Sequence, residues 1–211
     1  MKAALLVAGL GTRLRPITQH TPKCLVPING RPLLAMWLEK LVHGGVTEVL
    51  INTHWLAQAV RDYLTANTPQ GLKVHLFHEP QLLGSAGTLS ANREFFADGP
   101  FFIIYGDNFS DVDLANMYQA HRQCRPLITL GTFATDCPQK CGIAEIDPEG
   151  VVTGFVEKPE NPTSNCAAAG IYIAEPGIFD CFPQSENQAT LDIGFDIVPR
   201  LLGKMRNYPI N

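Results

Sequence analysis

Residues 3–27 constrain the fold more than any other part of this sequence. An uninterrupted apolar run occupies residues 3–8 and predicts a buried strand that stops at Gly9. Gly11 follows in the same loop, and three cations come after it: Arg13, Arg15 and Lys23. A strand that leads into a glycine loop with nearby cations is typical of a polyphosphate site, because glycine lets backbone N–H groups approach phosphate oxygens.

Two common phosphate-binding loops are excluded by specific positions. The dinucleotide fingerprint requires a third glycine where this chain has Leu14, which argues against a nicotinamide-dependent oxidoreductase. The P-loop requires the triplet Gly-Lys-Ser/Thr, which occurs nowhere in the sequence. Lys23 lies between Pro22 and Pro27, whose rings restrict the backbone, so we favour a placed functional lysine over a solvated surface one.

Segments of strand-like and helix-like character alternate through the first two thirds of the chain. We expect strands over residues 48–52, 73–77, 101–105 and 127–133, and helices over 32–43, 56–64, 86–96 and 114–122. Later segments are predicted to form a β-hairpin over 143–156, a strand over 170–174 and short helices over 176–182 and 195–203. This order predicts an α/β fold in one domain over residues 1–211, with a mixed, mostly parallel sheet flanked by helices and a β-hairpin excursion in the second half.

Composition excludes several classes of function. The net charge of −4 argues against nucleic-acid binding, and no apolar run approaches the ~20 residues of a membrane span. Only six apolar residues separate Lys2 from Gly9, so we expect no export signal and a cytoplasmic protein. We expect the six cysteines to be reduced thiols, and Cys137 and Cys141 lack the further Cys or His pair of a zinc site.

The opening motif resembles that of a known family. The pattern G-x-G-T-R-L-R-P at residues 9–16, followed by P-K-x-L-x-P at residues 22–27, resembles the sugar-1-phosphate nucleotidylyltransferases, also called NDP-sugar pyrophosphorylases. The resemblance implies a Rossmann-like fold and the conversion of a nucleoside triphosphate and a sugar 1-phosphate into an NDP-sugar and pyrophosphate. It implies a catalytic role for Lys23 between the two substrates' phosphates. It also implies that the nucleotide is held by Ala8, Gly9, Gly11, Thr12 and Arg13, with Arg13 catalytic as well.

Asp107 follows the most apolar of the expected strands. An acid at the carboxyl end of a strand can hold a metal beside a bound nucleotide, although an Asx turn with Asn108 and Ser110 would also explain it. In the family that this chain resembles, a Gly-Asp motif supplies a Mg²⁺-binding aspartate. The resemblance therefore implies that Asp107 is a catalytic metal ligand and that Mg²⁺ is the cofactor.

A second glycine-bearing loop opens the helix expected after residue 85. The family uses a loop of this type to read the nucleobase, which implies nucleotide contacts from Glu79, Gly84, Ser85 and Gly87. An ordinary helix start with Ser85 as the N-cap is compatible with that role. The L-G-S-A-G form looks most like mannose- and heptose-1-phosphate guanylyltransferases, so GTP is favoured and UTP remains an alternative.

The sequence Phe-x-Glu-Lys-Pro at residues 155–159 matches the family's sugar-phosphate motif. The resemblance implies that Glu157 accepts sugar hydroxyl bonds and that Lys158 contacts the phosphate, whereas a bare surface ion pair would contribute little. Gly142 and Gly170 match positions where the family's backbone touches the sugar. The family often has asparagine two residues before that second glycine, and this chain has Ala168 there.

The largest departure from the family concerns a late metal-binding aspartate. No acid occurs in residues 201–211, so we expect the chain to lack the family's C-terminal segment. Asp192 and Asp196 are the available substitutes, and helix N-terminal charge is the simpler explanation for both. The departure favours an alternative function, a catalytically silent regulatory subunit that binds nucleotide-sugars. The expected partners are a nucleoside triphosphate and a sugar 1-phosphate, without nucleic acid or membrane, and a homo-oligomer is compatible with the sequence.

Overall fold

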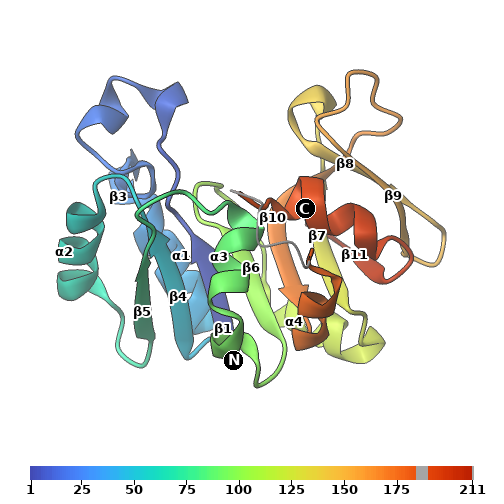
Figure 1. Ribbon diagram of the computed structural model, residues 1–211, viewed down its shortest axis with the longest axis horizontal. Helices are drawn as coiled ribbons and strands as arrows, with labels where there is room; N and C mark the ends of the chain where they lie inside the picture. Colours follow the sequence, from blue (N-terminus) through green and yellow to red (C-terminus); the bar gives the residue numbers. More distant parts are fainter. Residues whose placement is uncertain (184–189, 211) are drawn as a thin grey trace.

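The computed structural model describes residues 1–183 and 190–210. A central sheet organises this part of the chain, with its main strands in the order β11-β7-β10-β6-β1-β4-β5 (Figure 1). Their bounds are β1 (Lys2–Leu6), β4 (Glu48–Thr53), β5 (Lys73–His78), β6 (Phe101–Tyr105), β7 (Ile128–Ala134), β10 (Cys166–Ala174) and β11 (Met205–Pro209). β8 (Gly142–Ile146) and β9 (Val152–Glu157) form a hairpin attached to β10, and β2 (Pro27–Ile28) pairs with β3 (Arg31–Pro32) in a separate ribbon.

The predicted mixed, mostly parallel sheet is confirmed. β1 is parallel to β4 and β6, β4 is parallel to β5, and β11 is parallel to β7. Only β10 runs against its neighbours β6 and β7 among these seven described strands. The chain first adds β4 and β5 on one side of β1 and later places β6 on the other side. Ligands of open α/β sheets bind at the carboxyl ends of strands where the strand order reverses in this way.

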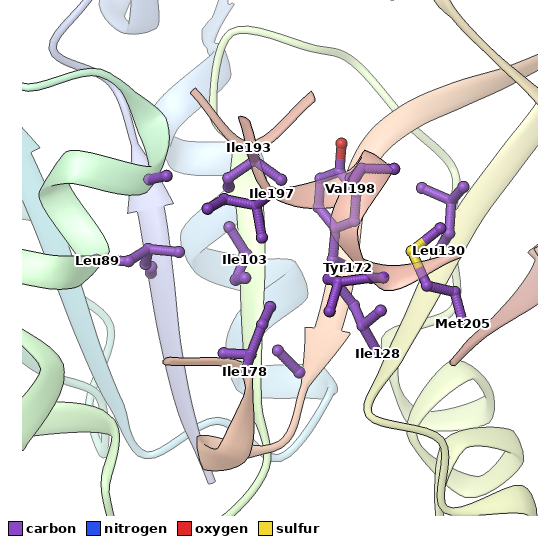
Figure 2. Packing of buried hydrophobic residues seen from close by; sticks show 14 of the residues in the cluster. Leu89, Ile103, Ile128, Leu130, Tyr172, Ile178, Ile193, Ile197, Val198 and Met205 are labelled. Atoms are coloured by element: carbon purple, nitrogen blue, oxygen red, sulfur yellow. The ribbon is translucent and has the colours of Figure 1, made fainter. Parts of the chain in front are cut away.

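Two hydrophobic layers cover the two faces of the sheet. Alternate residues of β1 point to opposite faces, so Ala3 and Leu5 belong to one buried cluster and Ala4 and Leu6 to the other. The first cluster contains residues of α1 (Leu33–His43), α2 (Ala57–Asn67) and α4 (Leu114–Cys124). The second contains α3 (Ser85–Ala91) and the late helical turns, which pack on Ile103 and Tyr172 (Figure 2).

Several element boundaries differ from the expected ones. The helix expected to reach residue 96 ends at Ala91 and continues as the 3₁₀ turn η4 (Arg93–Phe96). The expected helix at 195–203 is instead a π-helical turn, η7 (Ile193–Ile197), followed by the 3₁₀ turn η8 (Val198–Leu201), where Pro199 cannot donate a backbone hydrogen bond. β11 was not expected. Within the described residues, no helix has the length and apolarity needed to cross a bilayer.

Two excursions project from the same end of the sheet. Figure 1 shows the arm that follows β1, in blue, and the β8–β9 hairpin, in yellow and orange, rising at opposite sides of that end. The arm contains the 3₁₀ turns η1 (Thr12–Leu14), η2 (Ile17–Gln19) and η3 (Lys23–Leu25). The carboxyl ends of β1 and β6 lie between these excursions, which is where the sequence motifs converge.

Candidate active site

Two adjoining cavities open at the carboxyl ends of β1 and β6. The smaller has a volume of about 260 Å³ and is lined by the loop after β1 and the loop before α3. The larger has a volume of about 1320 Å³ and is lined by the arm, the β8–β9 hairpin and η7. Tyr105, Asp107 and Asp192 line both cavities. A ligand with two parts could therefore occupy both, with its middle beside Asp107.

The glycine loop forms the floor of the smaller cavity. β1 ends at Leu6, and the N–H of Val7 donates to Asn52 Oδ1 on β4 over 2.7 Å. Gly9 lines the cavity, and a Cβ placed there would meet nothing within 4 Å. Gly11 has φ of +63°, and a Cβ there would lie 2.8 Å from Thr18 Cγ2. Glycine at that second position lets the chain turn sharply into the arm.

Lys23 and Asp107 meet where the two cavities join. Lys23 Nζ donates a charge-assisted hydrogen bond to Asp107 Oδ2, so an arm residue and a residue after β6 form one ion pair. Their side chains are 23% and 38% exposed, which leaves both groups accessible to a ligand in the cavities. Gly106 lets the turn after β6 pack closely against Val7, because a Cβ there would lie 2.6 Å from Val7 Cγ1.

Glu79 is a buried carboxylate at the back of the smaller cavity. It is 1% exposed, and Oε1 accepts hydrogen bonds from Asn52 Nδ2 at 2.8 Å and Thr88 Oγ1 at 2.6 Å. Oε2 accepts from the N–H of Leu83 at 3.0 Å. A carboxylate offers about four lone-pair directions. These three bonds hold Glu79 in place and leave acceptor capacity at Oε2 for a ligand donor.

The loop before α3 is clamped by residue Leu191. The N–H groups of Ala86 and Gly87 donate to Leu191 O at 2.9 and 3.2 Å, and Leu191 N donates to Leu83 O at 2.9 Å. Gly84 has φ of +79°, and a Cβ there would collide with Leu191 O. The N–H of Gly87 is thus used within the protein, so that position does not offer it to a nucleobase.

Asp192 is the N-cap of η7. Its Oδ1 accepts from the N–H groups of Gly194 and Phe195 at 2.8 and 3.2 Å, and its Oδ2 accepts from Ser85 Oγ at 2.9 Å. Asp196 Oδ2 accepts from the N–H of Asp192 at 2.7 Å. These bonds favour the capping explanation of both acids. Across residues 1–183 and 190–210, no group of three or more His, Cys, Asp and Glu residues forms a metal cage.

The end of the β8–β9 hairpin forms one wall of the larger cavity. Gly142 pairs with Glu157, and a Cβ on Gly142 or on Gly194 would lie 2.5 or 2.7 Å from Glu157 Oε2. The carboxylate therefore fits between two glycines, and its side chain is 17% exposed. Lys158 has φ of +49°, and its Nζ lies 3.4 Å from Glu157 Oε1. Backbone strain at a bulky residue often marks a functional position.

Gly170 joins the hairpin side of the site to β6. It has φ of +69° at the irregularity in β10, and a Cβ there would lie 2.7 Å from Asn108 Nδ2. Asn108 Nδ2 donates to Ala169 O at 3.0 Å, and Trp37 Nε1 donates to Asn108 O at 2.9 Å. Asn108 thus holds the Asp107 turn against β10. The sequence pattern assigns Asn108 only to a turn. Its place directly after the Gly-Asp motif is the signal that could have indicated this positioning role.

Burial keeps three groups around the cavities neutral: the thiol of Cys24 and the hydroxyls of Tyr105 and Tyr172. Desolvation raises the pKa of Cys24 to about 12, so this thiol beside Lys23 is a poor nucleophile. Desolvation also raises the pKa of Tyr105 and Tyr172 well above the usual value for tyrosine. Tyr105 then remains a neutral donor, and its OH donates to Ser85 Oγ at 3.1 Å. Tyr105 therefore helps to position the loop before α3, and none of the three groups supplies a negative charge.

Most of the residues singled out from sequence converge on the two cavities. The smaller is lined by Ala8, Gly9, Lys23, Glu79, Gly84, Ser85 and Asp107. The larger is lined by Arg13, Asp107, Gly142, Glu157, Lys158 and Gly170. Among the residues singled out from sequence, all of which the structure describes, Gly11, Thr12 and Gly87 line neither cavity. Phe195, by contrast, lines the larger cavity without having been singled out beforehand.

Comparisons with known proteins match this chain to one family and to named relatives. A family model described as "Nucleotidyl transferase" matches residues 2–209. The chain is 32% identical over 217 residues to a UTP--glucose-1-phosphate uridylyltransferase of Synechocystis sp., covering 96% of this chain and 55% of the relative. It is 33% identical over 184 residues to mannose-1-phosphate guanyltransferase beta-A of Xenopus laevis, covering 85% of this chain and 51% of the relative.

A solved structure matches the whole described fold. The chain aligns with a Bacillus anthracis protein, provisionally described as a glucose-1-phosphate thymidylyltransferase, with a TM-score of 0.91 at 24% identity, covering 100% of this chain and 87% of that one. That likeness confirms the Rossmann-like fold. The chain spans about half the length of the two curated relatives, 55% and 51%.

Proposed function

Because the chain belongs to the nucleotidyl transferase family, we propose that it converts a nucleoside triphosphate and a sugar 1-phosphate into an NDP-sugar and pyrophosphate. The observation that carries this proposal is the position of Asp107 and its partner Lys23 at the junction of two cavities. The smaller cavity suits a nucleotide, and the larger, with Glu157 and Lys158, suits a phosphorylated sugar. The relatives named above act on the same classes of substrate.

The proposed chemistry is an in-line displacement at the α-phosphorus. An oxygen of the sugar phosphate forms a new bond to that phosphorus, and the bond to the pyrophosphate oxygen breaks, so pyrophosphate carries away the electron pair. Positioning and charge stabilisation supply the catalysis. Lys23 would contact the α-phosphate and the incoming sugar phosphate, Arg13 would contact the triphosphate, and Lys158 would hold the sugar phosphate. The high pKa of Cys24 argues against a thiolate nucleophile.

The residues at the junction fit a magnesium ion. Mg²⁺ is usually held by one or two carboxylates together with substrate phosphates and water, and does not need a cage made only of protein. Asp107 offers such a carboxylate, whereas Asp192 accepts two capping bonds at Oδ1 and one bond from Ser85 Oγ at Oδ2. We therefore propose Asp107 as the protein ligand of Mg²⁺, which would offset negative charge on the phosphates when bound.

We propose GTP with mannose or heptose 1-phosphate as the favoured substrate pair, and UTP as the next nucleotide. The remaining acceptor capacity of Glu79 Oε2 at the back of the smaller cavity supports this choice. Guanine can donate from N1–H and its 2-amino group, and uracil from N3–H, whereas adenine has an acceptor at N1. A panel of the four triphosphates should therefore rank GTP first, UTP next and ATP last.

The central test is the release of pyrophosphate. We expect Lys23→Ala to lower turnover by about 10²–10³-fold, by analogy with the loss of one oxyanion donor. Lys204→Ala removes an exposed lysine outside both cavities and serves as the matched control. Near-normal turnover in the Lys23 variant would refute its role between the substrates.

The alternative is a catalytically silent subunit that binds nucleotide-sugars. The intramolecular pair of Lys23 and Asp107 supports this alternative function, because a pair that substrates do not displace would keep both groups from taking part in catalysis. Binding of an NDP-sugar by the wild-type chain, without product from any pair of substrates, would select this alternative. We further propose a cytoplasmic location, which the six free thiols support.

A further inference from the structure

We infer that Phe195 is a sugar-recognition residue whose ring packs against the carbon–hydrogen face of the sugar in the larger cavity. The inference rests on the proposed function and names a contact within the same site. Phe195 belongs to η7, whose neighbours Ile193 and Ile197 are buried in the core. Phe195 itself is 58% exposed and lines the larger cavity. Its ring therefore serves the cavity and not the core.

The turn that carries Phe195 is anchored through its backbone, which fixes the place from which the ring projects. Asp192 Oδ1 accepts the N–H of Phe195 at 3.2 Å, and Ser85 Oγ accepts the N–H of Ile193 at 2.8 Å. The buried side chains of η7 pack into the cluster shown in Figure 2. Because the backbone of the turn is already anchored, a ligand that covers the ring would have to order only the side chain.

The groups around Phe195 suit a phosphorylated sugar. Lys158 Nζ lies 5.5 Å from the centroid of the Phe195 ring and 3.4 Å from Glu157 Oε1. Glu157 can accept hydrogen bonds from hydroxyl groups, and Lys158 can balance a phosphate. A pyranose has hydroxyls around its rim and carbon–hydrogen bonds on its faces, so it needs an apolar surface in addition to these polar groups. Phe195 is the exposed aromatic ring beside this pair.

Phe109 and Phe133 are also exposed and line the larger cavity, but among the described aromatic residues it is Phe195 whose ring contacts Lys158. Val156 is similarly exposed at 57% and directly precedes Glu157, yet it lines neither cavity. The alternation of β9 turns Val156 away from the face that carries Glu157. This residue therefore provides a matched control for losing exposed apolar surface close to the site.

Steady-state kinetics with GTP and mannose 1-phosphate form the first arm of the test. We expect Phe195→Ala and Phe195→Leu to raise KM for mannose 1-phosphate by about tenfold, while KM for GTP, and for pyrophosphate in the reverse reaction, stays within twofold. Val156→Ala should match the wild type. An unchanged KM for mannose 1-phosphate, or equal rises in KM for both substrates, would overturn the role.

Binding forms the second arm and does not depend on turnover. Calorimetry would compare GDP-mannose with GDP, and UDP-glucose with UDP, in the wild type and in Phe195→Ala. We expect the variant to lose affinity for the sugar nucleotide but not for the nucleoside diphosphate. If no sugar nucleotide binds the wild type more tightly than its diphosphate, the inference fails. Failure of catalysis alone, with this difference intact, would instead refute the proposed reaction.

A double-variant comparison separates the sugar contact from the positioning of Lys158. If Phe195 only held the lysine in place, Phe195→Ala would have no effect in a Lys158→Met background. We expect the loss of sugar-nucleotide affinity to persist in that background. Its disappearance would overturn the proposed contact with the sugar.

Discussion

Lys23 and Asp107 neutralise each other across the junction of the two cavities. Both side chains remain partly exposed, so incoming phosphates can compete for Lys23 while Asp107 becomes available to a cation. Neither partner needs to leave the site for this exchange. At the scale of single residues, we therefore propose that the pair is a preassembled contact, in which Lys23 would take a phosphate and Asp107 a cation when the substrates bind.

Asp107→Asn tests the cation side of this exchange. We expect the Mg²⁺ concentration for half-maximal turnover to rise by about tenfold or more, because metal sites lose that much affinity even when only supporting residues change. Mg²⁺ titration of turnover is the measurement. Asp136→Asn, an exposed acid outside both cavities, is the control. Identical titration curves for Asp107→Asn and wild type would refute the ligand assignment.

At the scale of elements, the loop before α3 depends on a segment far away in the sequence. Leu191 bonds to Leu83, Ala86 and Gly87, and Ser85 bonds to Asp192 across 107 positions. Asp192 in turn caps the turn that carries Phe195. The wall of the smaller cavity and the wall of the larger cavity are therefore parts of one hydrogen-bonded unit.

The backbone of Gly84 provides a test of this unit. Gly84 has φ of +79° and ψ of 167°, a conformation reserved almost entirely for glycine. Gly84→Ala also forces a Cβ against Leu191 O, so we expect a loss of about 3 kcal/mol in the free energy of unfolding. Gly203→Ala has a similar φ of +78° but no neighbour within 4 Å, and should cost about 1 kcal/mol. Urea denaturation measures both, and equal losses would contradict the close approach.

Helix and strand elements were predictable to different degrees. The strand over 101–105 was confirmed at its exact bounds, because a continuous apolar run buried on both faces has few alternatives. β11 was missed, since its sequence, Met-Arg-Asn-Tyr-Pro, has neither alternation nor β-branched residues. It forms a strand because β7 offers an unpaired edge, to which Met205 and its successors bond in register.

At the scale of the whole molecule, the buried His121 ties α4 to the sheet and to the segment after β10. It is 1% exposed, with Nδ1 2.8 Å from Thr129 Oγ1 and Nε2 3.3 Å from Glu175 Oε1. Burial lowers the pKa of His121, and the adjacent Glu175 only partly opposes that effect. The folded protein therefore binds a proton at this site less readily than the unfolded chain does.

This difference predicts how stability depends on pH. In the unfolded chain this histidine has an ordinary pKa of about 6.5. Acidification from about pH 7.5 therefore protonates the unfolded state first and lowers the free energy of unfolding. The loss continues until the pH falls below the lowered pKa of the folded state. His121→Asn should show a shallower decrease over this interval in urea denaturation series. A slope as steep as that of the wild type would exclude His121 as its source.

Several features of the protein were determined by the sequence itself. The alternating apolar segments specify an α/β sheet, because side-chain period and chain order restrict how strands and helices can pack. The glycine loop and Asp107 follow the carboxyl ends of β1 and β6 and thus marked one edge of that sheet. Their meeting at two adjoining cavities follows from the common direction of β1 and β6, whereas Lys23 arrives from the arm and Glu157-Lys158 from the hairpin.

Only the tertiary structure decided which groups are available to a ligand. The N–H of Gly87 is used by Leu191, and Asp192 is occupied as a cap, whereas Glu79 keeps acceptor capacity at Oε2 beside its three protein donors. The same contacts present Phe195 to the larger cavity. The bonds of Leu191 to Ala86 and Gly87, and of Asp192 to Ser85, join segments about a hundred residues apart, so local sequence patterns cannot encode them. They depend on the strand order, which brings the end of the chain back against the loop before α3.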